Sequence, residues 1–171
     1  MHNPKTDWCF KTEPDESING RSINYPRGKT LGGSSSINGL LYIRGQSQDY
    51  DIWRQQGNTE WGWDDVLPYF IKSENQERGK NEFHGVGGPL SVSNIRIKLD
   101  ILDEFQNAAE EIGIPKINDF NTGDNFGCDY FQVTEKNGLR CSTAVGYLNP
   151  AKKRSNLKVE VKAHVKQINF E

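Results

Sequence analysis

The amino-acid sequence predicts a mixed fold of helices and strands, of the α+β class in the chain as it stands, and three patterns carry this expectation. Residues 157–161 alternate apolar and polar side chains, as strands do. A glycine–serine turn at residues 32–36 precedes a short apolar run, which favours a helix start. Residues 99–112 show the clearest helical periodicity, because their apolar side chains recur at spacings of four, three and four: Ile101, Phe105, Ala108 and Ile112.

The first 26 residues are predicted to be extended and rich in turns. Residues 7–10 and 21–25 are candidate strands on either side of the Asn19-Gly20 dipeptide, which is a common hairpin turn. The stretch that follows contains a Gly pair and three serines. We expect an N-cap at one of Ser34–Ser36 and a short helix over residues 37–43, closed by Gly45.

Two further helices are predicted before residue 76. The first spans residues 47–56, with Ser47 as its N-cap and Gly57 after its end. The second spans residues 64–75, with Asp64 as its cap and one apolar face.

The second half of the chain is predicted to be richer in loops and short strands. Residues 76–90 form a loop that leads into a strand over residues 90–93. Beyond the helix at 99–112, we expect a strand around residues 130–133 and a helix over residues 142–148. The closing segment is predicted to form strands, at the ranges 157–161 and 165–170.

Composition excludes several classes of function. The 171 residues include 21 Lys and Arg against 23 Asp and Glu, so the net charge of −2 argues against nucleic-acid binding. No apolar stretch is long enough to form a transmembrane segment. The cysteines Cys9, Cys128 and Cys141 are too few and too far apart for a disulfide scaffold or a paired metal site, so no metal is expected.

The turn at residues 32–36 has two interpretations from its chemistry alone. Glycines allow a ligand to approach the backbone closely, and a helix start beyond them presents N–H groups and a positive dipole end to an anion. Arg27 and Lys29 add positive charge nearby. The other interpretation is an ordinary Gly-Ser turn without a ligand. The sequence contains neither a P-loop nor a GxGxxG dinucleotide motif.

The same stretch resembles the first signature of the glucose–methanol–choline (GMC) oxidoreductases, which are FAD-dependent alcohol dehydrogenases and oxidases. The signature comprises residues 28–38 with Tyr42, Gly45 and Asp51. Five further blocks follow the family's order over nearly the whole chain. They lie at residues 8–14, 48–53, 61–70, 84–90 and 140–165, and the choline dehydrogenase-like, alcohol dehydrogenase branch is the most similar.

The resemblance implies roles for individual residues. The loop from Arg27 would pass along FAD, with Gly32, Gly33 and Ser34 near the pyrophosphate. The backbone of Asn38, Gly39, Leu40 and Leu41 would line the flavin ring, and Val165 would contact the adenine. Members with covalent flavin can carry His where this chain has Ile37, so the resemblance implies non-covalent FAD.

The resemblance also implies an internal part of a longer enzyme. The family's N-terminal GxGxxG unit and its C-terminal catalytic histidine are not matched, because His2, His84 and His164 lie elsewhere; His84 is expected to be structural. We therefore assign no catalytic residue and expect no turnover from this chain alone. The other hypothesis is a non-enzymatic α+β module that binds a phosphate-containing ligand, or a degenerate truncated product.

For the intact enzyme, the resemblance implies an α/β FAD-binding domain joined to a substrate-binding domain. Residues 1–75 and 138–171 would belong to the first domain, and residues 76–137 would begin the second. A small-molecule alcohol would be oxidised by hydride transfer to flavin, with an unknown electron acceptor. The expected location is the cytoplasm, or the membrane periphery for the intact enzyme.

Overall fold

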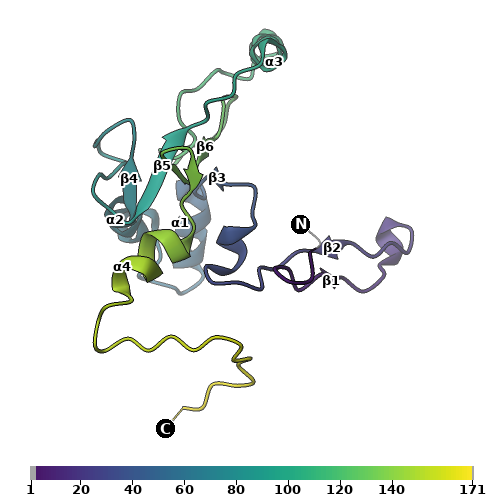
Figure 1. Ribbon diagram of the computed structural model, residues 1–171. Helices are drawn as coiled ribbons and strands as arrows, with labels where there is room; N and C mark the ends of the chain where they lie inside the picture. The colour runs from purple at the N-terminus through teal and green to yellow at the C-terminus, as the bar shows by residue number, and fades with distance from the viewer. Residues whose placement is uncertain (1–2, 171) are drawn as a thin grey trace.

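The strands of this chain are short and form three small sheets, while its helices lie outside them (Figure 1). The computed structural model describes residues 3–170. The strands are β1 (Phe10–Lys11), β2 (Asn24–Tyr25), β3 (Leu41–Tyr42), β4 (Glu74–Gln76), β5 (Leu90–Asn94), β6 (Gln132–Val133), β7 (Glu135–Lys136) and β8 (Leu139–Arg140). The α-helices are α1 (Ser47–Gln55), α2 (Trp63–Ser73), α3 (Asp100–Glu111) and α4 (Asn149–Ala151). Single helical turns occur at Glu16–Ile18, Gly33–Ser36 and Ala144–Leu148.

The N-terminal hairpin forms with shorter strands than predicted and a longer connection, in which Asn19 is the C-cap of the helical turn at Glu16–Ile18. Strands β1 and β2 pair antiparallel, with Phe10 opposite Tyr25. Asn19 and Gly20 both take left-handed backbone conformations, with φ of 60° and 66°, as the turn prediction required. The hairpin projects from the rest of the molecule (Figure 1).

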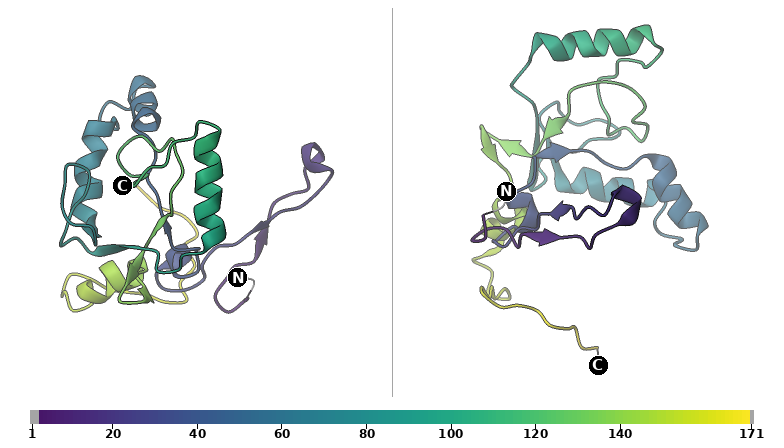
Figure 2. Two further views of the ribbon diagram at one scale, coloured as in Figure 1. Left: turned by 90° about the horizontal axis from the view of Figure 1, so that it is seen from above. Right: turned by 90° about the vertical axis from the view of Figure 1, so that its right-hand side faces the viewer.

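The central element is a four-stranded mixed sheet in the order β3–β6–β5–β4. Strands β3 and β5 each pair antiparallel with β6, whereas β4 runs parallel to β5. Helices α1 and α2 contact each other beside this sheet, and α3 stands apart from it (Figure 2). The sheet therefore joins strands from both predicted domain segments, 1–75 and 76–137.

The predicted helix over residues 37–43 is wrong. Leu40 has φ of +69°, which no right-handed helix accommodates, and the apolar run continues as β3 with Leu41 opposite Val133. Local propensity allowed either structure, and pairing with β6 decided the outcome. None of Ser34–Ser36 is an N-cap there. These serines lie inside the helical turn Gly33–Ser36, whose N-cap is Gly32.

Helices α1 and α2 confirm the two predicted helices, with their caps shifted. Gln46 rather than Ser47 is the N-cap of α1, and its N–H donates to Asp49 Oδ2 over 2.9 Å. In α2 the N-cap is Gly62 rather than Asp64, and Asp65 accepts from its N–H. In both helices the carboxylate at the third position accepts a hydrogen bond from the N–H of the N-cap residue. An acidic residue in the first turn was therefore the sequence feature that marked where each helix begins.

The later elements agree with the sequence except at the end of the chain. Helix α3 and strand β5 lie where they were expected, β6 covers part of residues 130–133, and the predicted helix at 142–148 is a π-helical turn that leads into α4. Strand β4 begins where the second predicted helix was still expected to continue. The predicted strands at 157–161 and 165–170 are wrong, because the tail finds no strand edge among residues 3–170 to pair with.

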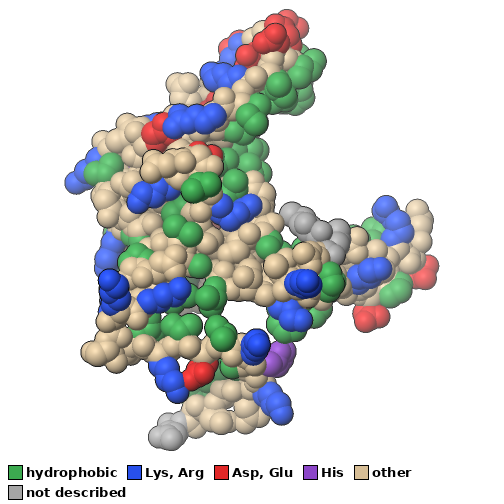
Figure 3. Space-filling model, viewed as in Figure 1, with side chains coloured by type: hydrophobic (Ala, Val, Ile, Leu, Met, Phe, Trp, Pro, Cys, Tyr) green, Lys and Arg blue, Asp and Glu red, His purple; other side chains and the backbone are tan. Residues whose placement is uncertain are grey.

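The interior is polar to an unusual degree. Among the described residues, four hydrophobic side chains are buried: Val92, Ala109, Val133 and Cys141. The buried polar set is larger: Asp7, Arg44, Glu74, Gln76, His84, Ser91, Ser93, Asn121, Gln132 and Ser142. The apolar face of α3 is exposed, with Phe105 at 66 %, and Figure 3 shows hydrophobic side chains gathered along that helix. Among residues 3–170, no helix has the length and hydropathy needed to cross a membrane.

Candidate functional site

The glycine–serine turn packs against Gly28, and the space between them is too small for a side chain at Gly28. A Cβ at Gly28 would lie 2.1 Å from the carbonyl oxygen of Gly33, so only glycine fits there. The N–H of Gly28 donates to Ser34 Oγ over 3.2 Å. Gly32 has φ of +87°, which also favours glycine. The turn is therefore a closed loop with half-buried glycines at positions 28, 32 and 33.

Arg140 and Thr143 fasten this loop from a distant part of the sequence. The Arg140 guanidinium donates to the carbonyl oxygen of Ser35 over 3.1 Å, and to Asn38 at both Oδ1 (2.6 Å) and the carbonyl oxygen (2.8 Å). Thr143 donates its N–H to Ser35 Oγ and its hydroxyl to the carbonyl of Gly32. The sequence analysis assigned these two residues no role in the site. The one sequence feature that could have indicated their role is that both residues lie in the family-like block at residues 140–165.

The backbone from Asn38 to Leu41 lies open beside this fastened loop. A Cβ at Gly39 would meet no atom within 4 Å, and its N–H makes no hydrogen bond within residues 3–170. The N–H of Leu40 donates to Asn38 Oδ1, and Leu41 is 53 % exposed. Gly39 is therefore the exposed point of this segment, since Arg140 bonds the carbonyl of Asn38 and Thr134 bonds the carbonyl of Leu40.

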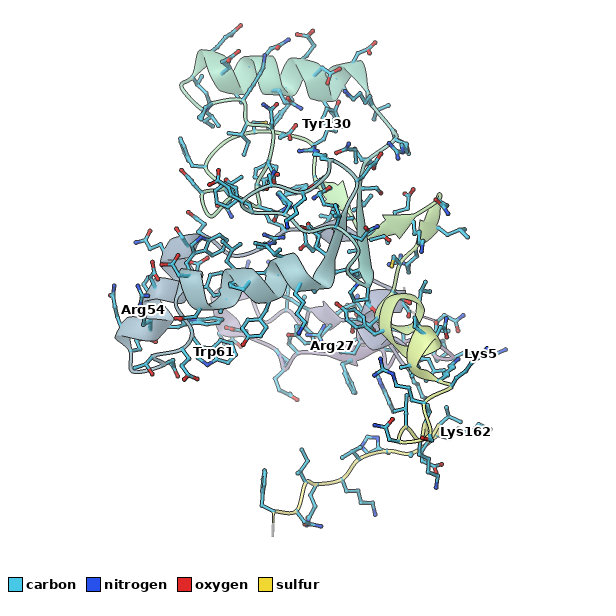
Figure 4. The ribbon with its side chains drawn as sticks, turned by 90° about the vertical axis from the view of Figure 1, so that its left-hand side faces the viewer. Lys5, Arg27, Arg54, Trp61, Tyr130 and Lys162 are labelled. Atoms are coloured by element: carbon cyan, nitrogen blue, oxygen red, sulfur yellow. The ribbon has the colours of Figure 1, made fainter. Side chains whose placement is uncertain are left out.

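A second opening lies between the N-terminal hairpin and the C-terminal tail, where Figure 3 shows a hollow. Its volume is about 700 Å³. The lining includes Lys5, Trp8 and Lys29 from the N-terminal side and Glu160, Lys162 and His164 from the tail. Figure 4 shows Lys5 and Lys162 on the same side of the molecule. The excess of lysines over carboxylates, together with two aromatic rings, suits an anionic ligand that carries a flat ring system.

The two remaining predicted site residues lie apart from the Gly32–Leu41 segment. Arg27 turns its guanidinium back over the ring of Tyr25, 4.1 Å from its centroid, and donates to the carbonyl oxygen of Pro26 (Figure 4). Val165 is 75 % exposed on the tail, next to His164, whose ring meets Trp8 edge to face at 5.7 Å. Gly32, Gly33, Ser34 and residues 38–41 thus lie in one segment that Arg140 and Thr143 hold, and Val165 follows His164, which lines the hollow.

Behind the sheet edge, a buried ionic network centres on Glu74. Its Oε2 accepts from Arg44 Nη2 and from His84 Nδ1, each over 2.9 Å. The other ring nitrogen of His84 lies 2.7 Å from Asp119 Oδ2. Burial alone would lower the pKa of His84, but the two carboxylates outweigh burial and raise the pKa to about 9. His84 is thus a buried structural residue, as the sequence predicted.

No group of three or more His, Cys, Asp or Glu side chains within residues 3–170 is arranged to hold a metal ion. Cys9, Cys128 and Cys141 are all free thiols. The exposed backbone at Gly39 and the lysine-lined hollow are two features of the described residues that suit a ligand. A further hollow of about 720 Å³ lies beside α1 and α2, and its lining includes Tyr50, Trp61 and Phe70.

Comparison with curated proteins finds relatives at about 40 % identity. The chain is 40 % identical over 171 residues to an alcohol dehydrogenase [acceptor] of Pseudomonas putida, covering 99 % of this chain and 31 % of that protein. It is 42 % identical over 161 residues to an oxygen-dependent choline dehydrogenase of Vibrio vulnificus, covering 93 % of this chain and 29 % of that protein. The chain therefore spans about three tenths of the length of these relatives.

Solved structures show the same relationship. A pyridoxine 4-oxidase from Mesorbium loti matches with a TM-score of 0.86 and 28 % identity, over 95 % of this chain and 34 % of that one. An FAD-dependent oxidoreductase from Chaetomium thermophilum matches with a TM-score of 0.81 and 26 % identity, over 91 % of this chain and 29 % of that one. The family model for GMC oxidoreductases matches residues 12–171. Because that match spans nearly the whole chain, the protein belongs to the GMC oxidoreductase family.

Proposed function

We propose that this chain is the part of an FAD-dependent oxidoreductase that holds the flavin, and that the intact enzyme oxidises the CH–OH group of a small alcohol. Family membership supports the reaction class. The observation that carries the cofactor assignment is the open backbone at Asn38–Leu41, held in place by Arg140. Bound FAD would supply the acceptor for the hydride that leaves the alcohol carbon.

The chain's residues bind and orient in this proposal. Gly32, Gly33 and Ser34 present a backbone that a pyrophosphate can approach, and the N–H of Gly39 can donate to the flavin ring. Donors fixed in position stabilise the negative charge that the ring gains, because they need no reorganisation during the reaction. Ile37 offers no nucleophilic atom, so we propose non-covalent binding. The base that removes the alcohol proton would come from outside these 171 residues.

The larger assignments follow from the same proposal. Residues 1–75 and 138–171 would belong to the FAD-binding domain, with Val165 at the adenine, and residues 76–137 would begin the substrate-binding domain. The substrate would be a small alcohol of the kind named for the relatives, an alcohol or choline. The electron acceptor and the location, cytoplasmic or at the membrane periphery, stay predictions.

Flavin binding by the 171-residue chain tests the proposal. Titration with FAD is followed by quenching of flavin fluorescence, with circular dichroism confirming that each variant is folded. Gly39→Val is the informative variant, because its side chain enters empty space in the free protein but occupies the space a flavin would fill. We expect at least a 10-fold weaker affinity, whereas Gln48→Val, which adds the same side chain at an exposed position of α1, leaves affinity unchanged.

Two results would contradict this proposal. Folded wild-type chain that leaves flavin fluorescence unchanged would argue against the cofactor assignment. Equal affinity for wild type and Gly39→Val would show that the flavin binds elsewhere. Acid precipitation of the loaded protein tests the attachment, since a yellow pellet would mean a covalent bond.

A further inference from the structure

His84 lies between two carboxylates that can only accept hydrogen bonds. Its Nδ1 is 2.9 Å from Glu74 Oε2, and its Nε2 is 2.7 Å from Asp119 Oδ2. The side chains of His84 and Glu74 are at most 1 % exposed, so water does not replace the contact between them, and the Asp119 side chain is 17 % exposed. A neutral imidazole carries one N–H and could satisfy only one of these acceptors. Nδ1 also lies 3.2 Å from Gln76 Nε2, whose two N–H groups are directed at Glu74 and Gln132. The geometry therefore favours protons on both ring nitrogens.

Two arginines accompany the two carboxylates of the cluster. Glu74 also contacts Arg44, and Asp119 lies 4.0 Å from Arg78, so protonation of His84 gives the cluster a net charge of +1. The support for a cationic ring is therefore the contact of each ring nitrogen with a carboxylate and not the charge balance. Neighbouring Tyr42 accepts from Arg44 Nε, and burial raises the pKa of its hydroxyl, which keeps it neutral. The neutral members of the network are Gln76, Gln132 and Asn121, which hydrogen-bond to these charged groups or to one another.

Two routes connect this cluster to strand β3. The first is covalent and short: Arg44 lies two residues beyond the end of β3, and its guanidinium contacts Glu74, the carbonyl oxygen of Phe83 and the carbonyl oxygen of Asn121. The second runs through side chains, because Gln76 Nε2 donates to both Glu74 and Gln132.

The second route ends in the sheet itself. Gln132 belongs to β6 and pairs with Tyr42 of β3 in the sheet register. Leu41 is the neighbouring residue of β3, and the open backbone of the candidate site begins three residues earlier at Asn38. Both routes therefore reach β3 at or just beyond Tyr42, next to this backbone.

We propose that His84 is an imidazolium cation that positions the Asn38–Leu41 backbone of the cofactor site through Glu74 and Arg44. The link to flavin rests on the function proposed above, whereas the cationic state and the coupling to the backbone do not. His84 touches no part of the open surface, so it is a positioning residue. Loss of its proton removes one charged hydrogen bond from the cluster, while Glu74 keeps its bonds from Arg44, Gly85 and Gln76, and we expect this change to shift the attachment of β3.

Nuclear magnetic resonance of the full chain without flavin tests both parts. Ring ¹⁵N signals of labelled histidine, assigned with His84→Gln, report the protonation of each nitrogen. We expect both His84 nitrogens to be protonated at pH 7.5. We also expect the amide signals of Gly39 and Leu41 to shift with the same alkaline midpoint as the ring.

Two variants make the test specific. Asp119→Asn keeps the shape but removes one charge within 3 Å of the ring, so it lowers the midpoint by about 1 pH unit or more. Asp64→Asn, an exposed position on α2, leaves the midpoint unchanged. If His84→Gln does not fold, Asp119→Asn still gives the comparison.

Two results would overturn the inference. One is a single protonated ring nitrogen of His84 at pH 7.5. The other is a set of Gly39 and Leu41 amide signals that do not follow the titration of the ring. A separate FAD titration from pH 7 to 10 then tests the link to function, since affinity is expected to fall with the same midpoint. Absence of FAD binding would contradict the proposed function and leave the positioning role standing.

Discussion

Replacing Glu74 with glutamine removes the negative charge that Arg44 and His84 share. Glutamine has nearly the same shape, so the change leaves no cavity. The cost is electrostatic, because Arg44 and His84 are both nearly inaccessible to water, at 4 % and 1 % exposure. Removing one partner of a buried ion pair costs about 3–5 kcal/mol. This is a large share of the roughly 5–15 kcal/mol by which a domain is usually stable.

Urea unfolding followed by circular dichroism measures this cost. With a typical slope of about 2 kcal/mol per molar urea, the midpoint of Glu74→Gln falls by about 2 M. The matched control is Glu160→Gln, whose partner Lys158 is 87 % exposed and whose own side chain is 62 % exposed. We expect the control to cost less than about 1 kcal/mol, as surface pairs do. Equal midpoints for the two variants would refute the central role of the buried network.

Three other changes test separate features. Gly28→Ala places a Cβ 2.1 Å from a backbone carbonyl oxygen, so we expect a loss of about 2–4 kcal/mol in urea unfolding; an unchanged midpoint would contradict the closed loop. Arg140→Leu removes three hydrogen bonds to the loop, and we expect FAD affinity to fall about 10-fold or more in a fluorescence titration while Arg154→Leu has no effect. The raised pKa of His84, about 9 against 6.5 unfolded, contributes stability that is fully present below pH 6.5 and is lost as pH rises through 9. Melting temperatures from pH 6 to 10 are therefore expected to fall for wild type and to change less for His84→Gln.

Local patterns predicted the local elements of this fold. Helices α1, α2 and α3 follow apolar periodicity bounded by acidic first turns, which act within a few residues. The Asn19-Gly20 turn likewise depends on the backbone preferences of two residues. The loop at Gly28–Ser36 was found because glycines and serines are required there by contacts within the loop itself.

The features that the sequence did not reveal are set by distant partners. Whether residues 37–43 form a helix or a strand depends on β6, about 90 residues away, and the tail at 155–170 pairs with no strand among residues 3–170. The same holds for the hydrogen bond from Arg140 to Asn38, which joins residues 102 positions apart. A single sequence contains no signal that pairs such positions.

The polar interior explains why the core was the hardest part to predict. Sequence patterns locate a core by its apolar periodicity, yet in α3 the periodic face is exposed while Glu74 and His84 are buried elsewhere. Apolar surface left in water is costly, and patches of this kind mark surfaces that contact other protein. The chain spans about three tenths of its relatives, which have the additional length to cover such a face. A buried ion pair also fixes the positions of the groups it joins, in addition to the stability that is lost when one partner is removed. Under the proposed function, the Asn38–Leu41 backbone would need such fixed geometry, because a binding site depends on the rigid elements that support it.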